Sequence, residues 1–209
     1  MNSPQIHKEL VVYTDFICPW CYIGAAHLKQ LQETMPCKVN YVLFPLHPDT
    51  PPGGITLYEL FGGSAGDIDR RQKEIREHAL ELGLKYKTRT HSYNSFNAQV
   101  IGKGLSKFGK FEEFQESVFN EYFGAGQDIG SLDVLQTLLN DISPNRWSAY
   151  NMINDPVSKG EVKKDWRAAR AHGVYSVPTY RFRNRYCTGV QSSTKLISML
   201  QDDSSETAR

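Results

Sequence analysis

Two cysteines separated by two residues, Cys18 and Cys21, lie between an apolar run and a segment with helical periodicity. The run at 10–13 is Leu-Val-Val-Tyr, and a short block of β-branched and aromatic residues is typical of a buried strand. After the cysteines, apolar residues recur at helical spacing from Ile23 to Leu31. The pair is therefore predicted to lie where a strand ends and a helix begins.

A second strand is expected after this helix. Residues 38–44 are rich in valine and aromatic side chains, and the proline that follows them ends the run. A strand, a helix and a second strand within about 35 residues form a βαβ unit. Strand patterns return at 178–183 and 186–190, joined at Asn184-Arg185, and a last helix is expected from about 194 to 201.

Between these ends, the pattern from 55 to 172 is helical. Gly124 is expected to end one helix of this segment. Ser143-Pro144 and Asp155-Pro156 are each expected to begin one, because serine or aspartate caps a helix and proline suits its first turn. Gly173 can supply the left-handed residue that ends the last helix.

This outline predicts an α/β protein with a thioredoxin-like fold that is split by an all-helical insertion domain. The thioredoxin-like domain is expected to take residues 8–54 and 173–201, and the insertion 55–172. Residues 202–209 are polar and are expected to form a frayed tail.

Composition restricts the partners and the compartment. The 209 residues carry 24 Lys and Arg against 23 Asp and Glu, and this net charge of +1 indicates neither nucleic-acid nor anionic-membrane binding. No long apolar stretch predicts a membrane span, and the first apolar run is too short for the core of a signal peptide. Four cysteines are too few for a secreted disulfide framework, so we expect a cytoplasmic protein.

The chemistry that fits the cysteine pair is disulfide exchange, which needs a thiolate that attacks and a second thiol that resolves the mixed disulfide. At a helix start, free backbone N–H groups and the helix dipole favour an anion at Cys18, with Cys21 one turn deeper. Pro19 suits this first turn because its missing N–H would have no partner there. We predict Cys18 as the nucleophile and Cys21 as the resolving cysteine.

Other uses of the pair lack the residues that they need. A zinc site needs two further ligands, but the six histidines include no pair at the usual spacing, and Cys37 and Cys187 stand alone. Haem attachment needs a histidine after the second cysteine, where Tyr22 stands. We expect no metal and no bound cofactor.

Residues 15–24, Asp-Phe-Ile-Cys-Pro-Trp-Cys-Tyr-Ile-Gly, resemble the active-site segment of the DsbA-like oxidoreductases, and in particular that of their cytoplasmic FrnE-like branch. Residues 173–179, Gly-Val-Tyr-Ser-Val-Pro-Thr, resemble the cis-proline loop of the same family. The resemblance extends over nearly the whole chain. Supporting matches lie at 44–49, 94–98, 122–129 and 189–191.

This resemblance implies that Pro178 is cis and faces the cysteines, and that the backbone of Val177 pairs with an extended substrate beside the sulfurs. The implied substrate-binding residues are Pro19, Trp20, Val177 and Pro178. From the residues alone, Val177-Pro178 is more simply explained as the start of an edge strand, because only about 5–6% of X–Pro bonds are cis.

The chain departs from the family pattern at Gln99, where a histidine is common, and at Tyr175-Ser176, where a small glycine-containing step is usual. Neither departure is expected to touch the thiols. Between the cysteines, Trp20 replaces the histidine of periplasmic DsbA and adds no positive charge near a Cys18 thiolate. We therefore predict a reduction potential below that of DsbA, suited to reducing or isomerising disulfides.

Asp15 lies three residues before the first cysteine. As carboxylates do in related thioredoxin folds, it would relay a proton to Cys21, and the alternative is a structural aspartate that orders the turn. Cys37 and Cys187 fall on opposite sheet edges in the implied strand order, so both are expected to be free thiols. Residues 85–89, Lys-Tyr-Lys-Thr-Arg, are typical of a solvated loop, with contact to an anionic thiol such as glutathione as the alternative.

The leading hypothesis is dithiol–disulfide exchange on disulfide-containing proteins or low-molecular-weight thiols and disulfides, with glutathione as an optional co-substrate. A second hypothesis is a glutathione-dependent transferase or isomerase of the kappa-class or 2-hydroxychromene-2-carboxylate isomerase type. These enzymes resemble the same outline but typically carry serine at the position of Cys18. A third is a non-catalytic chaperone or binding module. The oligomeric state stays open, with a dimer among the options.

Overall fold

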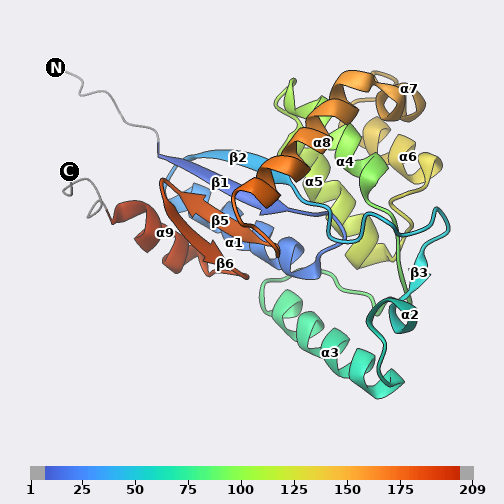
Figure 1. Cartoon of the computed structure of the whole chain (residues 1–209), viewed down its shortest axis with the longest axis horizontal. Coiled ribbons are helices and arrows are strands. Elements are labelled where there is room, and N and C mark those ends of the chain that lie inside the picture. Colours follow the sequence, from blue (N-terminus) through green and yellow to red (C-terminus); the bar gives the residue numbers. More distant parts are fainter. Residues whose placement is uncertain (1–7, 203–209) are drawn as a thin grey trace.

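The strand predicted at 10–13 is β1 (Glu9–Thr14), which lies inside a four-stranded sheet in the computed structural model (Figure 1). The structure describes residues 8–202, so all of the predicted tail except Asp202 lies outside the described residues. The elements that follow β1 are α1 (Pro19–Thr34), β2 (Lys38–Leu43), β3 (Ile55–Thr56), α2 (Leu57–Phe61), α3 (Ala65–Glu81), β4 (His91–Ser92), α4 (Phe96–Ser106), α5 (Phe111–Phe119), the π-helical segment η1 (Asn120–Ala125), α6 (Leu132–Ile142), α7 (Ala149–Asn154), α8 (Pro156–Ala171), β5 (Thr179–Phe182), β6 (Arg185–Thr188) and α9 (Ser193–Gln201).

The strand order of the main sheet is β2-β1-β5-β6. β1 and β2 are parallel, with Val12 opposite Tyr41, which confirms the predicted βαβ unit. β5 pairs antiparallel with β1, and β6 pairs antiparallel with β5. The turn of this hairpin is Arg183-Asn184, one residue earlier than predicted, and Arg183 adopts the left-handed φ of 56° that the tight turn needs.

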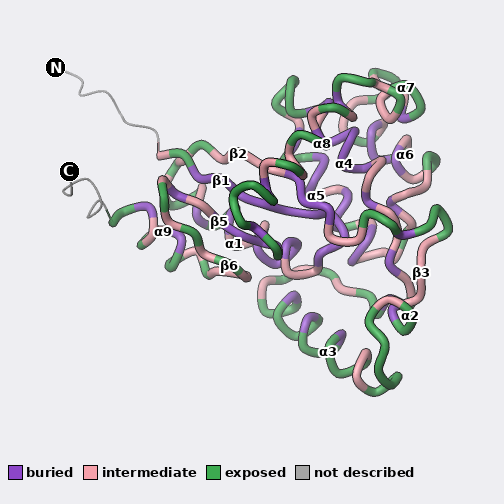
Figure 2. Tube along the Cα trace, viewed as in Figure 1, coloured by how far each residue is buried: buried purple, intermediate pink, exposed green. Residues whose placement is uncertain are grey.

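Both faces of β1 are buried, which explains its unbroken apolar run. Leu10 and Val12 pack in a cluster with residues of α1 and α9, whereas Val11 and Tyr13 belong to the large cluster shared with the helical segment. Figure 2 shows buried backbone along β1 and through α4 and α5, while α3 is mainly exposed. One face of β1 therefore packs against α1 and α9, and the other face packs against the helical segment.

The segment from 55 to 172 is mostly helical, with α8 packed beside β2 and α4 beside α8, and with α3 extending away from the other helices (Figure 1). It also contains one antiparallel pair, in which Ile55 of β3 lies opposite Ser92 of β4. The fold class is as predicted, and the insertion departs from the all-helical expectation only in this pair. Strands of two residues are too short to produce an alternating pattern.

Two predicted helix boundaries are wrong. Ser143 follows the end of α6 in an extended conformation, and the next helix, α7, begins after Ser148, whose hydroxyl accepts a hydrogen bond from the Asn151 N–H at 3.3 Å. Gly124 does not end its helix, because the chain continues through η1 to Gly126, which has a φ of 77°. In both cases a second residue nearby supplies the better cap.

Two other boundaries are confirmed. The carboxylate of Asp155 accepts hydrogen bonds from the N–H groups of Val157 and Ser158 and so caps α8. Gly173, with a φ of 70°, follows the end of the same helix. The chain then turns back towards the sheet, and the loop before β5 returns to the start of α1.

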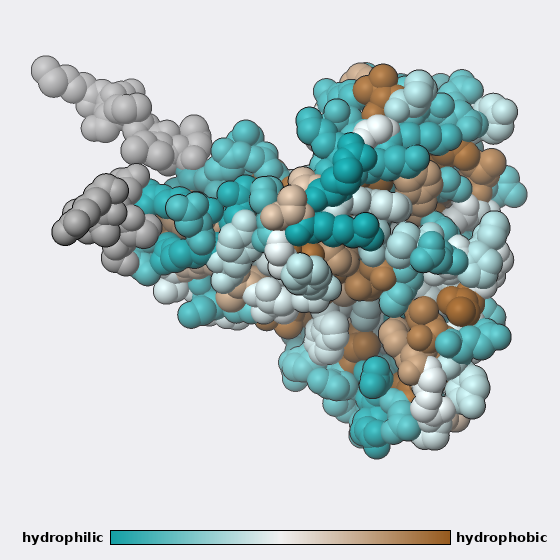
Figure 3. Space-filling view, viewed as in Figure 1, coloured by the Kyte–Doolittle hydropathy of each residue, from teal (hydrophilic) through white to brown (hydrophobic). Residues whose placement is uncertain are grey.

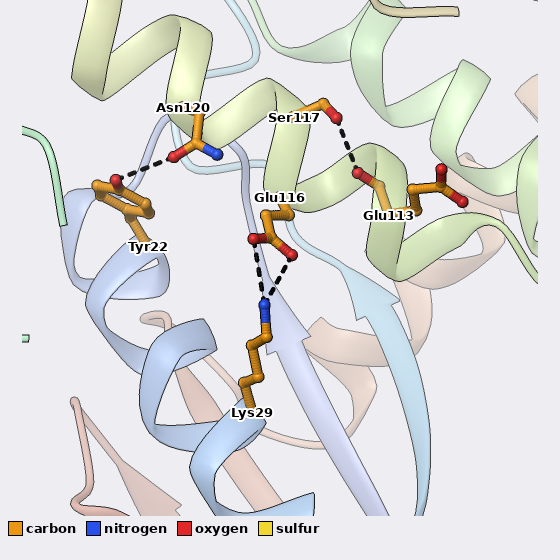
Figure 4. Close-up of polar contacts among 6 residues, drawn as sticks. All are labelled: Tyr22, Lys29, Glu113, Glu116, Ser117 and Asn120. Atoms are coloured by element: carbon orange, nitrogen blue, oxygen red, sulfur yellow. Dashed lines mark hydrogen bonds and ion pairs between the residues drawn. The ribbon is translucent and has the colours of Figure 1, made fainter. Parts of the chain in front are cut away.

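Contacts of α1 with α5 and with η1, which continues α5, hold the active-site helix against the insertion (Figure 4). The Lys29 ammonium lies 3.2 Å from the Glu116 carboxylate, and the Tyr22 hydroxyl donates to the Asn120 side-chain oxygen at 3.2 Å. The ion pair is largely exposed and contributes at most about 1 kcal/mol. The buried ring of Tyr22, stacked on Phe123 at 5.2 Å between centroids, makes the more substantial contact.

Within residues 8–202, no helix is both long enough and apolar enough to cross a membrane. The assignment of 8–54 with 173–201 to one domain and of 55–172 to another stays a prediction.

Candidate active site

Cys18 is the residue that caps the N-terminus of α1, with Pro19 in the first turn as predicted. Its backbone is extended (φ −86°, ψ 114°), and its side chain makes no capping hydrogen bond to the first turn. The thiol donates to the Val177 carbonyl oxygen at 3.3 Å, and 4% of the residue is exposed. A thiolate at this position is favoured by the positive end of the helix dipole.

Cys21 lies one turn further along α1 and is 3% exposed. Burial raises the pKa of its thiol well above the ordinary value, and the neighbouring Cys18 sulfur raises it further. The side chain of Thr14 and the backbone of Asp15 oppose this rise by hydrogen bonding to Cys21. Cys21 therefore holds its proton, as suits a resolving thiol that must wait for a mixed disulfide.

The loop at 173–178 brings the second half of the chain to the cysteines. The Val177–Pro178 peptide bond is cis, the isomer that the family resemblance implies. Gly24 allows the close approach of this loop to α1, because a Cβ there would lie 3.4 Å from the Pro178 ring and 2.5 Å from the Tyr180 hydroxyl oxygen. The structure thus brings the Val177-Pro178 loop to Cys18 and the start of α1, as the family resemblance implied.

A cavity of about 550 Å³ opens beside Cys18. Four of the residues that line it, Cys18, Pro19, Trp20 and Val177, are site residues expected from the sequence. Its other walls come from the connection after β2 and from the insertion: Leu46, His47, Leu57, Phe61, Ile68, Arg71, Gln72, Glu74, Ile75, Arg89 and Ser92, together with Ile17. Hydrophobic atoms gather over α2 and beside α3 in the space-filling view (Figure 3). The cavity is mainly apolar with a few polar groups, as small-molecule sites usually are.

Sequence reasoning missed the insertion residues of this cavity. They lie between 85 and 120 positions before Val177 in the chain, and no motif connects them to the cysteines. The basic stretch at 85–89, which contains Arg89, was the one part of the insertion for which the sequence suggested contact with a thiol substrate. Trp20 packs against His78 of α3, with ring centroids 5.5 Å apart, so the insertion also contacts the residue between the cysteines.

The imidazole of His47 is the group in the cavity wall that titrates nearest to neutral pH. Burial lowers the pKa of His47 below its ordinary value, which favours the neutral ring at pH 7. Its ring packs edge-on against Phe61 at 5.9 Å. His47 therefore adds hydrogen-bonding capacity to the cavity but little positive charge.

Asp15 is fully buried behind the pair. Its carboxylate accepts hydrogen bonds from the N–H of Leu46 at 2.9 Å and of Ile17 at 3.4 Å. Burial raises the pKa of Asp15, while the hydrogen bonds, including those from Ser95 and Gln99, oppose the rise. These contacts fit the alternative role of Asp15, a structural aspartate that orders the turn. Its role as a proton relay to Cys21 stays a prediction.

Gln99, the residue at which the chain departs from the family pattern, lies in the network around Asp15. Its side-chain amide donates to the Phe44 carbonyl at 2.9 Å and accepts from the Trp166 indole N–H at 2.8 Å. It is fully buried. Gln99 therefore ties α4 and α8 to the end of β2.

The remaining cysteines lie apart from this site. Cys37 precedes β2 and Cys187 lies in β6, on opposite edges of the sheet, and both are free thiols as predicted. Among the residues that the structure describes, no group of three or more His, Cys, Asp or Glu side chains is arranged to hold a metal ion.

The chain is 25% identical over 142 residues to the uncharacterized protein YwbO of Bacillus subtilis, an alignment that spans 64% of this chain and 66% of that protein. The structure of a probable DsbA oxidoreductase from Streptomyces coelicolor superposes with a TM-score of 0.84 at 20% identity, over 97% of this chain and 92% of the other.

Two further solved structures share the fold at 16% identity. A 2-hydroxychromene-2-carboxylate isomerase superposes with a TM-score of 0.75 over 92% of this chain and 94% of its own. The cytosolic disulfide reductase DsbM of Pseudomonas aeruginosa, in a structure with GSH, superposes with a TM-score of 0.61 over 93% of this chain and 94% of its own.

The family model described as the DSBA-like thioredoxin domain matches residues 9–201, from the first strand to the end of the last helix. This match includes both the cysteine pair and the Val177-Pro178 loop that faces it. The chain belongs to the DsbA-like thioredoxin domain family.

Proposed function

We propose that this protein catalyses dithiol–disulfide exchange through Cys18 and Cys21. The Cys18 thiolate attacks one sulfur of a disulfide, forms a mixed disulfide and releases the first thiol. Cys21 then attacks the Cys18 sulfur, releases the second thiol and leaves a Cys18–Cys21 disulfide. The substrate disulfide gains two electrons and two protons, which the cysteine pair gives up.

The position of the Cys18 sulfur is the observation that carries this proposal. It lies at the N-terminus of α1, within 3.3 Å of the Val177 carbonyl, and lines the cavity through which a substrate reaches it. An extended substrate segment beside Val177 would present its sulfur to the same atom. Pro19, Trp20, Val177 and Pro178 are the proposed substrate contacts, and Asp15 is the proposed proton relay.

Reduction or isomerisation is the proposed direction, on protein or low-molecular-weight disulfides. Trp20 supplies no charge that would stabilise a reduced Cys18 thiolate, and the neutral form of His47 supplies little. The cytosolic reductase DsbM, solved with GSH, is a relative of the same fold. By analogy with DsbM, we propose that this protein is a cytoplasmic enzyme that uses a thiol such as glutathione as electron donor.

An insulin-reduction assay with glutathione as electron donor tests the activity. We expect turnover by the wild type and a loss of about 100-fold or more in Cys18→Ser, because a serine hydroxyl is a poor nucleophile towards disulfides. A matched control is Cys187→Ser, which removes a distant free thiol. Equal activity in the wild type and Cys18→Ser would overturn the proposal.

A glutathione-dependent isomerase is the second candidate, and the observation in its favour is the cavity beside Cys18 on a fold shared with 2-hydroxychromene-2-carboxylate isomerase. The two candidates differ in their need for Cys21. Cys21→Ser abolishes dithiol turnover, whereas an isomerase that needs only one active-site group would keep most of its activity. Retained turnover of an aromatic substrate by Cys21→Ser, with no insulin reduction by the wild type, would favour this second candidate.

A further inference from the structure

Arg89 lies in the connection between α3 and β4 and is buried, with 9% of its surface exposed. Its neighbours Lys85, Lys87 and Thr88 are exposed, as expected for a solvated loop, but Arg89 turns inward. It lines the same cavity as Cys18. A positive charge therefore lies in the wall of the substrate cavity, on an element that is distant from the cysteines in the sequence.

The fold holds Arg89 firmly in this position. The side chain of Gln72, on α3, donates to the Arg89 carbonyl at 2.8 Å and accepts from the Arg89 N–H at 2.6 Å. The guanidinium donates to the Tyr122 hydroxyl at 2.7 Å. It also lies 4.8 Å from the ring centroids of both Tyr122 and Phe123. Pre-organised in this way, the guanidinium loses little freedom when it binds a ligand.

No anion balances this charge among the described residues. The polar side chains around the guanidinium are the phenol groups of Tyr86 and Tyr122, and no carboxylate forms an ion pair with it in the described part of the chain. A buried charge is costly unless it is paired. An anionic ligand in the cavity that Arg89 lines would supply a counter-charge.

The other charged groups of the cavity wall lie at its exposed edge. Arg71 and Glu74, on α3, are both exposed and of opposite sign. The buried part of the wall is mainly apolar, with Ile17 and Leu57 as its most buried aliphatic members, and it also contains the uncharged side chains of Gln72 and Ser92. The cavity therefore combines one buried cation with an apolar surface and with the attacking sulfur.

We propose that Arg89 binds the carboxylate of a small thiol or disulfide whose sulfur is presented to Cys18. This inference rests on the proposed exchange activity and names its substrate class: a low-molecular-weight disulfide with an apolar stem and a carboxylate end. The oxidising half-reaction is the one described above. Cys18 bonds to one substrate sulfur, the first carboxylate-bearing thiol leaves, and attack by Cys21 releases the second.

The test uses three small disulfides of similar length with different ends: dithiodipropionate with carboxylates, hydroxyethyl disulfide with hydroxyls, and cystamine with ammonium groups. Each oxidises the reduced protein, and each rate is divided by its rate with free dithiothreitol to correct for intrinsic reactivity. On this scale we expect dithiodipropionate to react about tenfold faster than hydroxyethyl disulfide, since hydrogen bonds to charged groups are worth roughly one power of ten or more. Cystamine should be the slowest.

Arg89→Gln should remove most of the ratio between dithiodipropionate and hydroxyethyl disulfide. The matched control is Arg76→Gln, an exposed arginine of α3 that does not line the cavity, and it should keep the ratio. Equal corrected rates for the three disulfides in the wild type would overturn the proposal, whether or not Arg89→Gln folds. A ratio that survives in a folded Arg89→Gln variant would also overturn it.

Failure of the exchange activity has a different signature, because the wild type would then react with none of the three disulfides. In that case the non-reactive thioether methylthiopropionate decides the anion site by itself, through NMR shift changes in the wild-type protein. Binding that Arg89→Gln abolishes supports the site. The absence of binding to the wild type, or equal binding to Arg89→Gln, overturns it.

Discussion

The two sulfurs of the first turn of α1 are almost equally buried but face different surroundings. Cys18 lines a cavity of about 550 Å³ whose opposite wall comes from α2, α3 and the loop before β4. Cys21 faces a gap of about 10 Å³, lined mainly by residues of the sheet, α1 and the cis-proline loop, with Gln115 of α5 as its one member from the insertion among the described residues. Such a gap has room for about one water molecule.

The difference separates two tasks within one motif. Residues of the insertion shape the space in front of the attacking sulfur, so changes there should alter which disulfides react. The residues around the resolving sulfur come mainly from the sheet, α1 and the cis-proline loop, so changes there should alter how the mixed disulfide is released. The predictions below test this division.

The largest expected effect is that of pH on the resolving step. Because burial raises the pKa of the Cys21 thiol above its ordinary value of 9.0, its thiolate fraction rises about tenfold per pH unit below that value. Resolution should therefore accelerate about 100-fold from pH 7 to pH 9. Reaction of the reduced protein with dithionitrobenzoate measures this directly, since the first coloured thiolate reports attack and the second reports resolution.

Cys21→Ser is the control for this experiment, because it should release only the first coloured thiolate. A second phase that keeps the same rate between pH 7 and pH 9 would show that Cys21 does not limit resolution. The assigned roles of the two cysteines would then be wrong.

The next effect concerns the close contact between α1 and the cis-proline loop. In Gly24→Ala the new methyl group would meet the Tyr180 hydroxyl at 2.5 Å and the Pro178 ring at 3.4 Å. Tyr180 is rigid and 1% exposed, so we expect a loss of about 1–3 kcal/mol in the free energy of unfolding. Urea denaturation measures it.

Gly160→Ala is the matched control, because a Cβ at this exposed position of α8 would meet no atom within 4 Å. It should stabilise the protein by about 0.5–1 kcal/mol through helix propensity alone. If Gly24→Ala were as stable as Gly160→Ala, the contact of α1 with Tyr180 and Pro178 would not be as close as described.

The surroundings of Cys18 and of Cys21 also differ in how far the sequence predicts them. The apolar run 10–13, the C-x-x-C spacing and the prolines after residue 44 predicted β1, the start of α1 and the end of β2, because each is a local signal. The position of Val177 and Pro178 beside the cysteines was predicted only from the family resemblance. Local signals failed at Ser143-Pro144, where a neighbouring serine makes the better cap.

The wall of the Cys18 cavity was beyond prediction for a different reason. Arg89 looks like any arginine of a basic loop, and its burial depends on Gln72, Tyr122 and Phe123, which lie up to 34 positions away. Gln99 similarly looked remote from the site, although it ties together the elements around Asp15. Tertiary contacts of this kind leave no periodic pattern in the sequence.

Trp20 lies between the two cysteines in the sequence and packs against His78 of the insertion, and its replacement should change the redox equilibrium. In Trp20→His, a protonated imidazole near the Cys18 thiolate would stabilise the reduced form. We expect the equilibrium with glutathione to shift about tenfold towards the dithiol, which corresponds to a rise of about 30 mV in reduction potential. Trp20→Phe serves as the uncharged control, and a wild-type potential as high as that of DsbA would contradict the role assigned to Trp20.

The smallest expected effect is that of Asp15→Asn on stability, and it separates the two roles of this carboxylate. Burial raises the pKa of Asp15 in the folded protein, so the folded state keeps the proton to higher pH than the unfolded state does. The stability that this protonation gives is complete below the unfolded pKa of about 3.9 and is lost as the pH rises through the folded pKa.

Asparagine cannot ionise, so the stability of Asp15→Asn relative to the wild type should increase between about pH 4 and pH 7, by roughly 1.4 kcal/mol for each unit of pKa shift. The exposed Asp141→Asn should show no such trend. If Asp15 relays a proton to Cys21, the second phase of the dithionitrobenzoate reaction should also slow in Asp15→Asn. An unchanged second phase, with the stability trend intact, would leave Asp15 only its role in ordering the loop through Ile17 and Leu46.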